Sequence, residues 1–227
     1  GIVVSTQNLF NSYNQLRVNA DLIQKNVEVM EAAANAVQTQ ASIGMATQAD
    51  VLKAQKNLQS IKSTQTETLS ILETLRQNLC MMTGWSYNAQ PEIKEVPQAD
   101  LAAIDQINLE ADRQKALENN YDLQYSRKAL NNMQENSTDK KNQERTVKNL
   151  EQSISASMTN LYNDIQQKKI AWQLAQAELA TEQQSMSATE TKRGLGMVSD
   201  LEYLQAQSSF LGKQIAEKTA NMALFQA

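Results

Sequence analysis

The acidic residues best placed for chemistry lie in a short stretch that occurs twice in the chain. In the first copy Asp50 follows Thr47 by three residues, and in the second Glu202 follows Ser199 at the same spacing. Carboxylates gathered at a narrow opening would favour cations and resist anions. The same spacing is also that of a capping box, in which a hydroxyl and an acid satisfy the free N–H groups of a new helix. From the sequence, both interpretations stay open.

A glycine precedes each of these pairs and predicts a turn between two helices. Gly44 and Gly196 lie at matching positions, each followed by Met, and each inside a long tract poor in Gly and Pro. Helices often end on a glycine, because glycine adopts the left-handed conformation without a clash of Cβ. An internal repeat of this kind predicts two helical hairpins whose tips are centred on the two glycines.

The composition excludes several classes of function. The 227 residues include no His and a single Cys, and they carry a net charge of −4. Without His, and without a nucleophile elbow, phosphate loop or cluster of metal ligands, we expect neither an enzyme nor a cofactor or metal site. The sequence has no stripe of basic residues of the kind that binds nucleic acid. It also has no apolar run long enough for a membrane-spanning helix. The one cysteine, Cys80, is expected to be a small buried residue.

Heptad spacing of apolar residues defines the arms of the hairpins. It runs through about 5–42 and, after the first tip, through about 47–83; the second hairpin is expected at about 147–193 and 199–227. Such seams are typical of helices packed side by side as in a coiled coil. The return arm of the first hairpin has Gln65 as its one amide interruption, and its apolar seam residues include Val51, Ala54, Leu58, Ile61, Leu72, Leu75 and Leu79. Most methionines, including Met30, Met82, Met158 and Met186, also fall on seams, which favours packing over metal binding.

The middle of the chain is less regular. Residues 85–98 hold both prolines and read as a linker. We expect one helix from Asp100 to about Asn119 and another from Tyr121 to about Gln134. Residues 134–146 are highly polar and are expected to form a loop or a solvated helix end.

The expected fold is therefore all-α, with long antiparallel coiled-coil hairpins in tandem repeat. Residues 1–84 would form the first hairpin, 85–146 the linker and shorter helices, and 147–227 the second hairpin.

The repeated stretch resembles the TolC, or outer membrane efflux protein, family. The pattern is Gly, five residues, an acid, an aliphatic or aromatic residue, Leu, then Ala and an apolar residue. The first copy matches it with Gly44, Asp50, Val51, Ala54 and Leu58, and the second with Gly196, Glu202, Tyr203, Ala206 and Phe210. A further stretch from Ala116 to Leu123 is similar to the family's Asn-Pro-acid-Leu helix, with Tyr121 where Pro is usual.

The resemblance implies a homotrimer whose helices form a hollow α-barrel in the periplasm. It also implies strands that join a β-barrel in the cell outer membrane of a Gram-negative bacterium. Residues 134–145 are too short and too polar to hold two strands of about 10 residues each. Such strands were deleted or replaced, lie outside this sequence, or never belonged to the protein.

The implied function is passive export, by efflux or type I secretion, of substrates delivered by an inner-membrane pump and a periplasmic membrane-fusion adaptor. The residues expected to dock the adaptor are Ile43, Gly44, Met45, Leu195, Gly196 and Met197. Three copies each of Asp50 and Glu202 would surround the entrance, where Lys192 and Arg193 could pair with them. The same two cations could instead only stabilise a helix C-terminus.

A structural coiled-coil scaffold or a periplasmic adaptor is the alternative. An adaptor normally has one hairpin flanked by β-rich domains, whereas this chain has two hairpins. A cytosolic coiled coil usually has Leu-rich seams flanked by Glu and Lys, whereas the flanks here are rich in Gln, Asn, Ser and Thr. The exported substrate is not encoded in any recognisable pattern.

Overall fold

A computed structural model describes residues 2–135 and 137–227, and within these residues every regular element is an α-helix. The all-α expectation is therefore confirmed. The helices are α1 (Ile2–Ser42), α2 (Gln48–Met82), α3 (Leu101–Asp105), α4 (Leu109–Asn119), α5 (Tyr121–Asn131), α6 (Thr138–Gly194) and α7 (Asp200–Phe225).

The chain forms two compact units, which are described separately. One contains residues 1–98 and 172–226, and therefore both hairpin tips; the other contains residues 99–171. The long helix α6 begins in the second unit and ends in the first.

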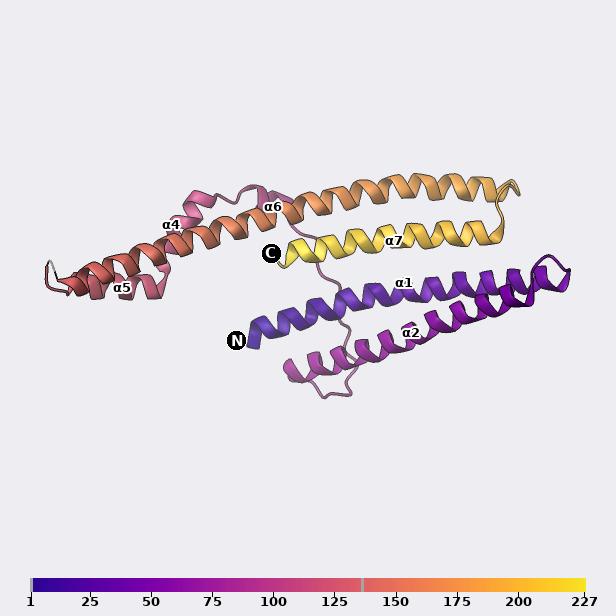
Figure 1. The fold of residues 1–227 in the computed structure, drawn as a ribbon, viewed down its shortest axis with the longest axis horizontal. Coiled ribbons are helices and arrows are strands. Elements are labelled where there is room, and N and C mark those ends of the chain that lie inside the picture. The colour runs from indigo at the N-terminus through magenta and orange to yellow at the C-terminus, as the bar shows by residue number, and fades with distance from the viewer. Residues whose placement is uncertain (1, 136) are drawn as a thin grey trace. The chain divides into compact units, whose positions relative to one another are not determined.

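In the first unit, α1 and α2 form an antiparallel pair joined at the first tip (Figure 1). The seam expected on α2 is confirmed at its ends, where Val51 is 2% and Leu79 is 6% exposed. The amide in this seam is not left unsatisfied, because Gln65 Nε2 donates a hydrogen bond to Gln24 Oε1. Most side chains on the other faces of α2 are exposed and polar, as coiled-coil flanks are.

A second face of α1 packs against α7, which lies beside it (Figure 1). Val18 of α1 forms a buried cluster with Ile215 and Met222 of α7. Ser208 Oγ of α7 also donates to Asn26 Oδ1, at 2.5 Å. The helix α1 thus has two packed faces, and only the one facing α2 was predicted.

Within this unit, the last part of α6 is tied to α7 by polar contacts. Trp172 is only 3% exposed, and its Nε1 donates to Glu217 Oε1 at 2.6 Å. Lys213 Nζ lies 2.8 Å from Glu178 Oε2, and this carboxylate raises the pKa of the Lys213 ammonium. These contacts join the two arms of the second hairpin in the part that lies away from its tip.

The linker begins where α2 ends. Gly84 has φ +83°, the left-handed value expected after a helix C-terminus. Arg76 is buried, and its Nε donates a hydrogen bond to Glu73 Oε2 at 2.8 Å. The Glu73 carboxylate raises the pKa of the Arg76 guanidinium. The Arg76 side chain also donates to the carbonyl of Ala89 in the linker. Beside it, Cys80 is 1% exposed, as predicted.

In the second unit, the single helix expected from Asp100 to about Asn119 is wrong. The structure has two helices, because the chain leaves helical geometry after Asp105 and starts again at Leu109. Asn108 caps the new helix: its side-chain oxygen accepts from the backbone N–H groups of Glu110 and Ala111, both at 3.1 Å. An Asn at this position stabilises a helix start.

Both expected forms occur in the polar stretch after α5: residues 134, 135 and 137 lie outside any helix, and a helix begins at Thr138. Residues 138–146 are helical and extend α6 toward the N-terminus, so the arm expected from 147 begins at Thr138. Gln143 Nε2 donates to the carbonyl of Ser126 at 3.1 Å, and Arg127 pairs with Glu151 at 2.8 Å. These polar contacts hold the start of α6 against α5, and Val147, 8% exposed, is the first buried apolar side chain of α6.

Candidate functional site

The first hairpin tip is a tight helix end followed by a restart. Gly44 has φ +77°, its N–H donates to the carbonyl of Ala41 at 3.1 Å, and the N–H of Met45 donates to the carbonyl of Gln40 at 2.8 Å. This is the pair of hydrogen bonds of a Schellman motif. The predicted role of the glycine is confirmed.

The second tip repeats the same geometry. Gly196 has φ +71°, its N–H donates to the carbonyl of Arg193, and the N–H of Met197 donates to the carbonyl of Lys192, both at 2.9 Å. The sequence repeat therefore corresponds to a structural repeat, atom for atom at the turn.

Both predicted capping boxes are present. Thr47 accepts from the N–H of Asp50 at 3.2 Å, and the Asp50 carboxylate accepts from the N–H of Thr47 at 2.9 Å. Ser199 and Glu202 make the same exchange at 3.2 Å and 2.8 Å. Each acid also accepts from the hydroxyl of its partner. Both acids therefore have a demonstrated structural role in starting α2 and α7.

These hydrogen bonds favour the ionised acids. The bond from the Thr47 hydroxyl, followed by that from its N–H, lowers the pKa of Asp50. The same two groups of Ser199 lower the pKa of Glu202. Both side chains are exposed, so each tip presents a negative charge to solvent at neutral pH.

The apolar side chains at the tips are among the most exposed in the molecule. Their exposed fractions are 65% for Ile43, 75% for Met45, 71% for Leu195 and 73% for Met197. Large apolar side chains standing in solvent at the end of a hairpin are typical of a contact surface. The seam methionines differ from them: Met186 is buried, although Met30 and Met82 are both 38% exposed and so only partly packed.

A cross-tip brace, defined here as Arg193, Asp200 and Tyr203, distinguishes the second tip from the first. Arg193 Nη2 lies 2.9 Å from Asp200 Oδ1, and its guanidinium carbon lies 3.8 Å from the centre of the Tyr203 ring. Within this chain Arg193 therefore pairs with Asp200, and not with Glu202 as one expectation had it. Lys192 is exposed on the same last turn.

Asp200 and Tyr203 were not predicted as partners of Arg193. The available signal was their spacing across the tip, seven and ten residues after the arginine. The positions of the first tip that correspond to Arg193, Asp200 and Tyr203, counted from the tip glycine, are occupied by Ala41, Gln48 and Val51. These three cannot form such a brace, so the two tips share a backbone but differ in side-chain chemistry.

The described residues contain no cluster of three or more Cys, Asp or Glu side chains placed to hold a metal ion. Among them, no helix combines the length and the apolar character needed to cross a membrane.

Comparisons with known proteins give a fold. No protein-family model matches the sequence, and no curated protein matches it. Among solved structures, CusC, known for transmembrane channel formation, matches with a TM-score of 0.63 at 16% identity, covering 97% of this chain and 74% of CusC. The outer membrane protein VceC of Vibrio cholerae matches with a TM-score of 0.53 at 12% identity, covering 99% of this chain and 68% of VceC. The chain thus has the helical fold of TolC-like channels, as expected.

Proposed function

We propose that this chain is the periplasmic helical wall of a trimeric outer-membrane channel that exports substrates passively. The observation that carries the proposal is the fold it shares with CusC over nearly its whole length. A fold alone does not fix a function, so the remaining support comes from the surfaces of the helices and from the tips.

The first unit has the make-up of one segment of a thin wall. In it α1 is packed on two faces, by α2 and by α7, while most side chains off the single seam of α2 are exposed and polar. A wall with water on both sides needs such polar faces. The wall closes into a ring if α2 of one copy lies beside α6 of the next. Exposed Leu69 on α2 and Leu174 on α6 are apolar side chains that such an edge would cover.

The tips would be the docking surface for a periplasmic adaptor, and through it for an inner-membrane pump. Ile43, Met45, Leu195 and Met197 are exposed, and each pair is presented by a hydrogen-bonded Schellman turn. A preformed apolar surface loses little conformational freedom on binding. Asp50 and Glu202 would add a ring of negative charge around the opening, in addition to capping their helices.

Imaging the full-length protein tests the assembly. The protein extracted from membranes in detergent should appear by electron microscopy as a threefold hollow ring of helices. Particles without a lumen, or a single extended chain, would contradict the proposal and favour a coiled-coil scaffold.

Docking is tested at the tips by substitution. Met45→Glu and Met197→Glu should abolish crosslinking to the cognate adaptor, because a charge would enter an apolar contact. Tyr121→Glu is a matched control, since Tyr121 is 78% exposed and lies in the other unit. Equal loss of crosslinking in all three variants would argue against docking through the tips.

A further inference from the structure

Five residues of the linker, 93–97, form a strap across the groove between α1 and α7. At one end, Arg17 Nη1 of α1 donates to the carbonyl of Ile93 at 2.8 Å. At the other, Asn221 Nδ2 of α7 donates to the carbonyl of Pro97 at 3.0 Å. The strap is therefore bound to both hairpins at once, through backbone groups that no helix or sheet uses.

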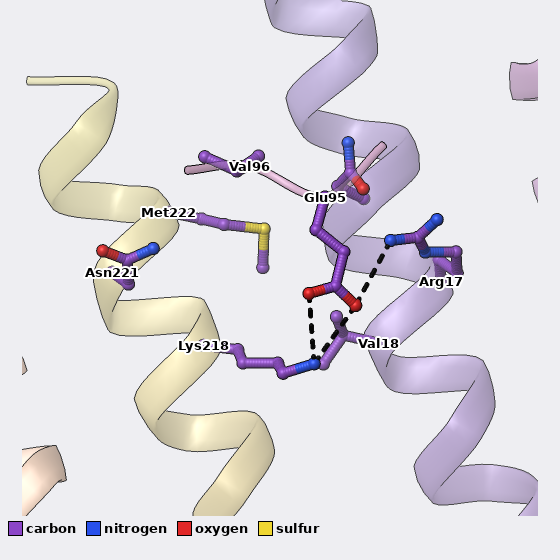
Figure 2. A pocket seen from close by; sticks show the side chains of 8 residues that line it. Arg17, Val18, Glu95, Val96, Lys218, Asn221 and Met222 are labelled. Atoms are coloured by element: carbon purple, nitrogen blue, oxygen red, sulfur yellow. Dashed lines mark hydrogen bonds and ion pairs between the residues drawn. The ribbon is translucent and has the colours of Figure 1, made fainter. Parts of the chain in front are cut away.

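The middle of the strap carries a single acid between two cations. Glu95 Oε1 lies 3.5 Å from Arg17 Nη2 and 3.2 Å from Lys218 Nζ. Figure 2 shows the Glu95 carboxylate pointing between the α1 and α7 side chains. One negative charge thus bridges two positive charges that belong to different hairpins.

The next residue completes an apolar contact. Val96 packs against the buried cluster of Val18, Ile215 and Met222, which is the seam between α1 and α7. A cavity of about 30 Å³ lies beneath the strap and is lined in part by Asn14, which is 1% exposed. The Asn14 Oδ1 atom has no hydrogen-bond partner among the described residues, and the cavity is large enough for a water molecule.

We infer that the strap is a releasable clasp that keeps the two hairpins paired. While it is bound, the attraction of Glu95 for both Arg17 and Lys218 outweighs the repulsion between the two cations, and α1 and α7 move as one body. When it leaves, the two cations face each other across the seam and Val96 uncovers the cluster, so the hairpins loosen. This inference does not depend on the channel proposal, because it concerns one chain alone.

The clasp is of a kind that can open without unfolding the helices. The Glu95 side chain is 64% exposed, so its ion pairs are weakened by salt. The strap itself has no regular secondary structure, and segments of that kind open locally at low free-energy cost.

Two measurements on the same chain report on the clasp. Trypsin cleaves after the exposed Lys94 only when the strap leaves the groove, because a protease needs several extended residues. Hydrogen exchange of the amides in 14–22 and 211–222 reports on the seam. Glu95→Gln should raise the cleavage rate several-fold beyond its effect on a free peptide of residues 90–99, a reference that is needed because Glu95 itself follows the cleaved bond. It should also raise the exchange of both segments, with exchange at the first tip, residues 40–48, unchanged. Glu92→Gln is the control, since it removes the same charge from an exposed linker position.

A second substitution separates the clasp from a general loss of stability. In the Glu95→Gln background, Lys218→Met removes one of the two repelling cations and should slow seam exchange again, although it deletes a further side chain. High salt should speed seam exchange in the natural protein, because it screens the ion pairs of Glu95. In Glu95→Gln it should slow seam exchange, because only the repulsion between Arg17 and Lys218 is left to screen. If Glu95→Gln speeds cleavage but leaves seam exchange as it was, the strap only covers the seam. If it changes neither, there is no clasp.

Discussion

Replacing the glycine of the second tip by alanine isolates the contribution of the turn to stability. Gly196 has φ +71°, and a Cβ built on it meets nothing within 4 Å. The cost of Gly196→Ala is therefore backbone strain alone, about 1–2 kcal/mol for a left-handed alanine. The unfolded chain becomes less flexible in the variant, which offsets about 0.4–1 kcal/mol. We expect a net loss of about 1 kcal/mol, or about 2–4 °C in Tm for a chain of this size.

A second glycine provides a matched control of opposite sign. Gly212 lies inside α7 with ordinary helical backbone, and a Cβ there also meets nothing within 4 Å. Gly212→Ala should stabilise the protein by about 0.5–1 kcal/mol, because glycine disfavours a helix interior. Gly196→Asn should cost less than Gly196→Ala, since asparagine tolerates the left-handed region.

Urea unfolding followed by circular dichroism measures all three variants, with tryptophan fluorescence as a second probe of two-state behaviour. The same sign of change for Gly196→Ala and Gly212→Ala would refute the reasoning, because a Cβ meets nothing at either site and the backbone conformation sets the opposite expectations. So would a Gly196→Asn variant that is less stable than Gly196→Ala.

Two further predictions concern the tips. In the folded chain the pKa values of Asp50 and Glu202 are lowered from ordinary values of 3.8 and 4.5. The stability that their capping contributes is therefore complete at pH values above the ordinary pKa, and it is lost as the pH falls through the lowered pKa of the folded state. NMR titration of the two carboxyls should show this, and titration at or above the ordinary values would contradict it. Arg193→Met should increase hydrogen exchange in residues 193–203, because it removes the contacts to Asp200 and Tyr203; Lys192→Met, its neighbour, should not, and equal effects would argue against the brace.

The sequence predicted the parts of the fold that depend on local rules. Hairpin arms follow from heptad spacing, and the tips follow from glycine and capping residues, whose interactions span at most five residues. Gly44 and Thr47 could therefore be assigned roles from their neighbours alone.

What the sequence did not predict depends on polar residues in packed positions. Asn11 and Asn14 are buried on the face of α1 that also carries Val18, and asparagine hides the apolar periodicity that would show a second seam. Asn108 gave a capping signal that was overlooked inside an otherwise helical stretch. The start of α6 at Thr138 was left open between a loop and a helix end, because residues 138–146 carry no apolar periodicity. The contacts that hold them are polar, as in the hydrogen bond from Gln143 to Ser126.

The contacts of the strap and the brace could not be predicted for a different reason. Glu95 meets Lys218 across more than half of the chain, and no local pattern encodes a pairing at that distance. Arg193 and Asp200 are close in sequence, but which acid the arginine selects depends on the direction of the side chains after the turn.

The central claim, that this chain forms the wall of a channel, is tested most directly by single-channel recording of the full-length protein in a planar bilayer. A channel of this kind should give discrete conductance steps with a preference for cations. The preference should be lower in Asp50→Asn/Glu202→Gln, which removes the acids proposed to surround the opening. A channel indifferent to these substitutions would leave the two acids as helix caps alone. Well-folded protein that gives no conductance would contradict the channel itself and favour a structural coiled coil.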